Sequence, residues 1–253
     1  MSFYVSWIQV IVMGNDKELK EKIDEAYQTL QSFFKSKESF LTQLDSIEST
    51  EEREKFLTLI IHYKYLVKES HLTTNGRNDD RFIGYINDTF QYLSLLSLIE
   101  SLYTEEKYQD FYQWLRSNKK KSILPIENNT QLEMVHESYL DFHGSTRKVV
   151  HFFQDIPDNY RWILEKDVER YKIEKGNGLP GKAVKEKPDI ERIARSLYQI
   201  RSDFVHDARL VTEISGIPSI TRRGNRYILS KLTIESFSLI FEVVILNKFG
   251  FEV

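Results

Sequence analysis

The stretch from residue 190 to residue 206 constrains the fold most strongly, because it places a charged residue inside a helical apolar pattern. Apolar residues recur there at the three-and-four spacing of a helix that buries one face: Ile190, Ile193, Ala194, Leu197, Ile200, Phe204 and Val205. At about 100° per residue, Arg201 falls near the centre of the apolar arc. A buried guanidinium is costly without a partner, so the sequence predicts a carboxylate beside Arg201.

The position of His206 relative to Arg201 allows several arrangements. His206 follows Arg201 by five residues, which is about 140° around an ideal helix, so the two side chains would not share a face. The arginine stem can reach around the helix, the helix can end and bend near Phe204, or the pair can converge across an interface with a second copy of the chain. The ordinary alternative is a core ion pair and a separate surface imidazole.

A second apolar stretch, residues 81 to 103, offers a carboxylate for Arg201. Its residues are apolar on almost all sides, as expected of a central helix that contacts several neighbours. Glu100 lies within this run, and a buried carboxylate is as costly without a partner as a buried guanidinium. We therefore expect Glu100 and Arg201 to pair.

Two strings in the chain carry a resemblance to a known family. Leu-Tyr-x-x-Arg-Ser-x-x-Val-His, at residues 197–206, resembles the signature helix of the HEPN superfamily, most closely its Apea-like branch. That signature is an arginine followed after four to six residues by a histidine, and four residues separate Arg201 from His206 here. Residues 90–103 are similar to the family's buried helix, which carries an acidic residue in an apolar run. The resemblance covers roughly residues 78 to 253.

The resemblance implies a fold and an activity. The fold is all-α, a mainly helical bundle that forms a homodimer. The activity is that of a metal-independent endoribonuclease of a toxin or phage-defence type, without a cofactor, which cleaves single-stranded or loop RNA by attack of the 2′-hydroxyl. The catalytic residues would be Arg201 and His206, with Ser202, Asp203 and Glu100 in support. An antitoxin or a defence-system protein would be a further partner.

The signature also departs from the family pattern. Ser202 follows the arginine, where the strictest active members have Asn, Asp or His. Asp207 follows the histidine, where Gly is frequent. These departures favour the alternative of a non-catalytic HEPN-like module that binds RNA or a protein.

Composition limits the partners and the compartment. The net charge is -3 and the sequence pI is about 6.1, so no overall positive field attracts nucleic acid and any RNA contact must be local. The absence of Cys excludes disulfides, thiolate zinc sites and a cysteine nucleophile, and it is compatible with the reducing cytoplasm that we expect. The apolar run at residues 3–13 is too short to span a bilayer and has no basic leader, so we expect no membrane partner.

Polar residues at 73–80 suggest a division of the chain. We expect an N-terminal helical region at residues 1–77 and the HEPN-like bundle at residues 78–253. In the first region, apolar spacing predicts an antiparallel pair of helices over 15–49 and 51–70. In the second, it predicts helices over 81–103, 105–118, 131–155, 190–206 and 231–249.

A small β-hairpin is expected near the C-terminus. Residues 210–214 and 219–228 alternate in polarity, and residues 223–226 have the composition of a tight turn. Three arginines, Arg222, Arg223 and Arg226, make the tip basic, so it would contact RNA phosphates or form an ordinary solvated turn.

Residues 176–183 have a superficial likeness to a phosphate-binding loop. Charged, helix-forming residues at 167–175 precede them instead of a buried strand, and Ala183 lacks the hydroxyl that would hold magnesium. Pro188 would also end the helix that should follow. We interpret this stretch as a mobile basic loop.

Overall fold

The computed structural model describes residues 16–71, 80–104, 111–115, 128–167, 170–173, 183–186, 189–207, 219–222, 225–229 and 232–252. Only the backbone is described for the strands and for parts of some helices, residues 203–207 included. The chain divides into two compact units. The described residues up to Ser70 and from Ile245 onwards form unit 1, and those from His71 to Val244 form unit 2.

Unit 1 is built from three short helices in sequence. They are α1 (Asp16–Leu30), α2 (Lys37–Asp45) and α3 (Thr50–Tyr63), with a 3-10 turn at Gln31–Phe33 and a π-helical turn at Lys64–Lys68. The single helical segment predicted over 15–49 is therefore wrong. The chain becomes extended at Phe34, and the Ser36 hydroxyl accepts a hydrogen bond from the Ser39 amide to start α2.

Four phenylalanines form the aromatic core of unit 1. The Phe251 ring lies 4.8 Å from Phe56, 5.8 Å from Phe34 and 6.1 Å from Phe40, measured between centroids. Gly250, at φ 81°, ends α10 (Ile234–Lys248) in the left-handed conformation that glycine adopts without strain. The Phe251 amide then donates to the carbonyl of Leu246 at 3.0 Å, which fixes the turn that places the Phe251 ring.

This core changes the expected division of the chain. We expected residues 78–253 to form one bundle, whereas the described residues from Ile245 onwards group with those up to Ser70. The reason is that Phe251, only 4% exposed, packs against the rings of Phe34, of Phe40 in α2 and of Phe56 in α3.

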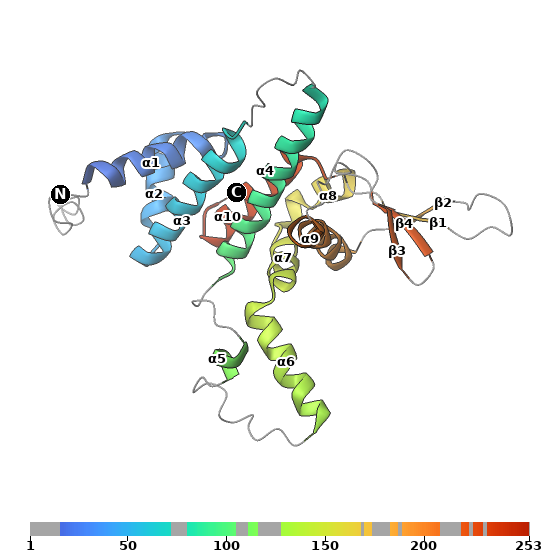
Figure 1. The fold of residues 1–253 in the computed structure, drawn as a ribbon. Helices are drawn as coiled ribbons and strands as arrows, with labels where there is room; N and C mark the ends of the chain where they lie inside the picture. The colour runs from blue at the N-terminus through green and yellow to red at the C-terminus, as the bar shows by residue number, and fades with distance from the viewer. Residues whose placement is uncertain are drawn as a thin grey trace. The chain divides into compact units, whose positions relative to one another are not determined.

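Unit 2 is organised around three helices that pack against one another, α4 (Asp80–Leu102), α7 (Ser145–Gln154) and α9 (Ile190–Asp207) (Figure 1). The other helices of this unit are α5 (Phe111–Leu115), α6 (Asn129–His143), α8 (Trp162–Asp167) and the part of α10 before Ile245. The predicted mostly helical fold is confirmed.

The core of unit 2 is also rich in aromatic side chains. Phe152 and Phe153 from α7 meet Phe237 from α10, with centroid distances of 6.3 Å and 5.8 Å. Tyr92 from α4 lies 5.3 Å from the same Phe237 ring. These contacts hold α4, α7 and α10 together, and Leu197 of α9 is buried as well.

The helix predicted over residues 131–155 is two helices, α6 and α7, separated at Gly144. The Gly144 backbone is extended, at φ -72° and ψ 109°. A Cβ atom at this position would collide with the carbonyl oxygen of Leu140, so the close approach requires glycine. Periodicity alone did not show the break because apolar residues recur at helical spacing in the sequence on both sides of Gly144.

Four short strands pair antiparallel in the order β2-β1-β4-β3. Their bounds are Arg170–Ile173 for β1, Ala183–Glu186 for β2, Ser219–Arg222 for β3 and Asn225–Leu229 for β4. The helical preference inferred for residues 167–175 is therefore wrong at β1. The C-terminal hairpin with an exposed basic tip stays a prediction, since residues 208–218 and 223–224 lie outside the described residues.

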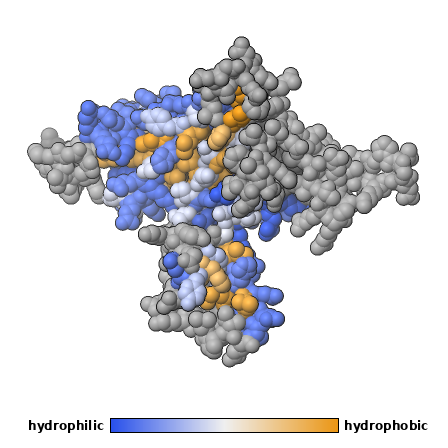
Figure 2. Space-filling model, viewed as in Figure 1, coloured by the Kyte–Doolittle hydropathy of each residue, from blue (hydrophilic) through white to orange (hydrophobic). Residues whose placement is uncertain are grey.

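Large apolar side chains are exposed at several places among the described residues, Leu66 and Trp162 included. Figure 2 shows hydrophobic residues at the surface of the part formed by α5 and α6, where Leu132 and Met134 of α6 are exposed. None of the helices in the described part of the chain has both the length and the apolar character that crossing a bilayer requires.

The packing of Phe251 predicts a stability effect. Phe251→Ala should destabilise unit 1 by about 3–5 kcal/mol, because a buried ring is lost from a core that cannot close around the cavity. Phe251→Leu, which keeps apolar volume, should cost less than about 1.5 kcal/mol. Amide hydrogen exchange in α3 measures the loss of stability in both variants. Unchanged protection in Phe251→Ala would mean that residues after Gly250 do not complete this core.

Candidate functional site

Glu100 and Arg201 meet between two helices of unit 2. Glu100 lies near the end of α4, and Arg201 lies in the second half of α9. The Nη2 group of Arg201 donates to Oε2 of Glu100 at 3.2 Å, and the side chains are 25% and 19% exposed. The pairing predicted from the two apolar patterns is confirmed, and each group offsets part of the burial cost of the other.

Tyr198 gives Arg201 a second contact, from the preceding turn of α9. Nη1 of Arg201 donates to the Tyr198 hydroxyl at 3.3 Å, and the guanidinium carbon lies 5.5 Å from the centre of the ring. A guanidinium has five N–H donors, and the contacts among the described residues use two of them. The others can donate to an anion.

The Glu100 carboxylate is only partly neutralised. Its Oε1 atom is buried and has no hydrogen-bond partner among the described residues. Burial raises the pKa of Glu100 above its ordinary value, although Arg201, Lys148 and the Ser145 hydroxyl oppose the shift. The burial effect is therefore the larger one, and Glu100 needs its cationic neighbours to stay charged.

Lys148 of α7 is the second cation of this cluster. Its Nζ donates to the Thr104 hydroxyl at 2.8 Å, and that hydroxyl donates to the Glu100 carbonyl at 2.6 Å. Burial lowers the pKa of Lys148, and the nearby Glu100 opposes that shift. Sequence reasoning missed Lys148, because nothing in its local pattern indicates that α7 faces Glu100.

The other predicted catalytic and supporting residues follow Arg201 on the same helix. Ser202 is half-buried, while the side chains of Asp203 and His206 lie outside the described residues. The backbone of α9 continues to Asp207, so the alternative in which the helix ends near Phe204 is wrong.

Two of the three predicted RNA-binding arginines, Arg222 and Arg226, have their backbone in the sheet. Arg222 belongs to β3 and Arg226 to β4, where Arg226 pairs with Thr221 across the two strands. Their side chains, and all of Arg223, lie outside the described residues.

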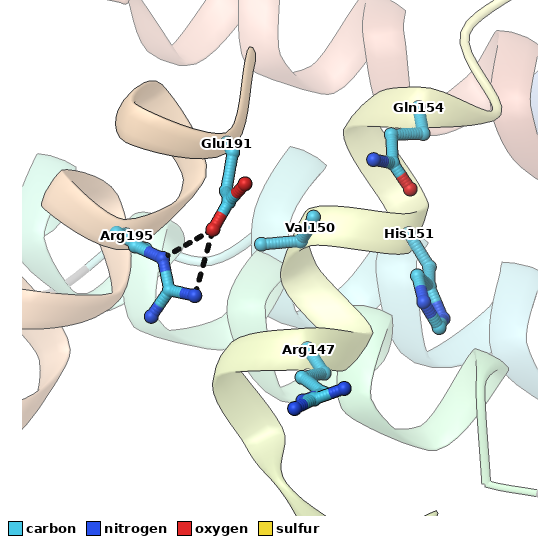
Figure 3. Close-up of a pocket in the computed structure, with 6 residues that line it drawn as sticks. All are labelled: Arg147, Val150, His151, Gln154, Glu191 and Arg195. Carbon is cyan, nitrogen blue, oxygen red and sulfur yellow. Dashed lines mark hydrogen bonds and ion pairs between the residues drawn. The ribbon is translucent and has the colours of Figure 1, made fainter. Parts of the chain in front are cut away.

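A pocket of about 250 Å³ lies between α7 and α9 (Figure 3). It is lined by Arg147, Val150, His151 and Gln154 from α7 and by Glu191 and Arg195 from α9. One sequence signal points to it: Glu191 and Arg195 are four residues apart, the spacing of a charged pair on one helix face. Within the described ranges, no group of three or more His, Cys, Asp or Glu could hold a metal ion.

The Glu100–Arg201 pair predicts a stability loss that depends on pH. Arg201→Met should cost about 1–3 kcal/mol at neutral pH, because Glu100 is left buried and charged. The variant should raise the folded-state pKa of Glu100 further above its unfolded value of about 4.3. The loss should therefore be smallest below that unfolded pKa and grow as the pH rises through the folded-state pKa. Urea unfolding at a series of pH values measures it.

Arg195→Met is the matched control on the same helix. Arg195 pairs with Glu191, but its side chain is 55% exposed, so its removal should cost less than about 1 kcal/mol. A loss in Arg201→Met that is the same at acidic and neutral pH would contradict the role given to Glu100.

Comparisons with family models, with curated proteins and with solved structures find no match to this chain.

Proposed function

We propose that the chain is a metal-independent endoribonuclease of the HEPN type, which cleaves single-stranded or loop RNA. The observation that carries the proposal is the state of Arg201, which Glu100 and Tyr198 hold in place with N–H donors to spare. This guanidinium lies five residues before His206 on one continuous helix, in the arrangement of the family signature.

The proposed reaction uses the RNA's own 2′-hydroxyl as the nucleophile. His206 accepts the proton of that hydroxyl, since an imidazole titrates near neutral pH, and the oxygen attacks the adjacent phosphorus. The bond from phosphorus to the 5′-oxygen breaks, and the 5′-oxygen takes up a proton as it leaves. The products are a 2′,3′-cyclic phosphate and a 5′-hydroxyl.

Arg201 stabilises the additional negative charge that develops on the pentacoordinate phosphorus. A guanidinium suits this role because it is always charged and its donors form a planar fork that matches phosphate oxygens. Glu100 and Lys148 act as positioning residues in this proposal. Glu100 fixes the orientation of the guanidinium before RNA arrives, and Lys148 helps to keep Glu100 charged.

The proposal includes a homodimer with α9 at or near the interface. A second copy would bring two sites into one cleft, and it would allow Arg201 of one subunit to act with the partner's His206, since about 140° separates the two positions on one helix. A toxin or defence protein of this type would work in the cytoplasm beside an antitoxin or a defence-system partner.

The alternative function is a non-catalytic HEPN-like module that binds RNA or a protein. Two observations favour it. Ser202 stands where active members of the family have Asn, Asp or His, and the net charge of -3 provides no general attraction for nucleic acid.

RNA cleavage by the purified chain in EDTA tests the two functions. Wild type should cut a mixed RNA, and His206→Ala, Arg201→Ala and Arg201→Lys should each lower the rate by about a hundredfold or more. The lysine variant should fail because a point charge does not replace the fork of donors. His136→Ala, at an exposed position on α6, is the control and should cut as wild type does.

Two results would contradict the nuclease. Equal cutting by wild type and His206→Ala would assign the activity to a contaminant. RNA binding without any cutting would support the non-catalytic module.

The oligomeric state gives a separate prediction. Light scattering at tens of micromolar protein should give the mass of a homodimer. The concentration matters because dimer formation depends on protomer concentration. A monomer at that concentration would exclude a site built from two copies and would leave Arg201 and His206 of one helix to act together.

A further inference from the structure

The pocket between α7 and α9 is lined by side chains with several N–H donors. Arg147 and His151 reach it from α7, and Arg195 and Glu191 reach it from α9 (Figure 3). Two guanidinium groups and an imidazole therefore lie against one carboxylate, with the amide of Gln154 as an additional donor. This lining suits an anion with several acceptor oxygens.

Both arginines are held in place by exposed carboxylates. Nε and Nη2 of Arg195 donate to the same oxygen of Glu191, at 2.9 Å and 2.7 Å, and Arg147 donates to Glu137. An exposed ion pair such as Arg195–Glu191 is worth about 0.2–1 kcal/mol, so a phosphate can engage the Arg195 guanidinium at little cost. Until then, Glu191 and Glu137 orient the donors.

The pocket is on the same side of α9 as positions 202 and 206, whereas position 201 is about 120° around the helix from position 195. On an ideal helix, positions 195, 202 and 206 fall within about 40° of one another, and about 16 Å of helix axis separates position 195 from position 206. That length corresponds to a few nucleotides of single strand. An RNA strand that lies along this side of α9, with its scissile phosphate near position 206, would reach the pocket with a neighbouring phosphate.

We infer that the α7–α9 pocket is a phosphate-binding subsite that holds the RNA backbone a few nucleotides from the cleavage point. This inference rests on the proposed nuclease function and extends it. The subsite gives the enzyme a local positive surface that its net charge of -3 does not provide. Because phosphates carry no base identity, it positions the strand and does not select a sequence.

Binding of an uncleavable 2′-O-methyl RNA strand to the full chain tests the subsite. Arg195→Gln and Arg147→Gln should each weaken binding by about three- to tenfold and should each lower the slope of log affinity against log salt by about 0.7, the value for one phosphate contact on a single strand. In cleavage, both should raise KM and leave kcat unchanged at saturating RNA.

Arg192→Gln is the matched control. Arg192 is on the same helix, its side chain is 58% exposed and it pairs with Asp189, but it does not line the pocket. Arg192→Gln removes the same charge at a position outside the pocket. Its RNA affinity and salt slope should therefore stay at the wild-type values. Circular dichroism melting curves check that all three variants fold.

The outcomes separate the subsite from the nuclease. If Arg195→Gln and Arg147→Gln bind as Arg192→Gln does while wild type cuts RNA, the subsite is overturned and the nuclease stands. If wild type binds the strand with the expected effect of both variants but does not cut, the subsite stands and the nuclease is overturned. If wild type neither binds nor cuts RNA, both are overturned.

Discussion

The ion pair between Glu100 and Arg201 is the interaction on which the arrangement of α4 and α9 depends. Either charge alone would be costly at this depth, so the two helices can bury their apolar faces together only where the two groups meet. The contact joins one oxygen to one nitrogen and leaves Oε1 of Glu100 without a partner among the described residues. Such a pair holds the guanidinium in position without using all of its N–H donors.

Burial opposes the charged form of two groups in this cluster, Glu100 and Lys148. Burial raises the pKa of Glu100, against the effect of Arg201 and Lys148, and it lowers the pKa of Lys148, against the effect of Glu100. A phosphate beside Arg201 would compete with Glu100 for the guanidinium, and Lys148 would then be the cation that remains for the carboxylate. The charged groups of this cluster can therefore change ion-pair partners while the helices keep their positions.

The sequence predicted those features that follow from a periodic pattern. The apolar spacing of α9 and the apolar run of α4 gave both helices and their ion pair, because a buried charge in each pattern demanded the other. The break at Gly144 was missed, since it depends on a backbone contact with Leu140 that periodicity does not record. The α7–α9 pocket and Lys148 were missed because they depend on which helices become neighbours.

The turn at Gly250 has a consequence for biosynthesis. It directs Phe251 into the core of unit 1, whose described residues lie up to Ser70 and from Ile245 onwards, so residues 71–244 separate the two parts of this unit along the chain. All of those intervening residues must leave the ribosome before Phe251 can reach Phe56. Until then, the helices of unit 1 that precede Ser70 keep part of their apolar surface exposed to water. During this interval the nascent chain is most prone to aggregation and most in need of a chaperone.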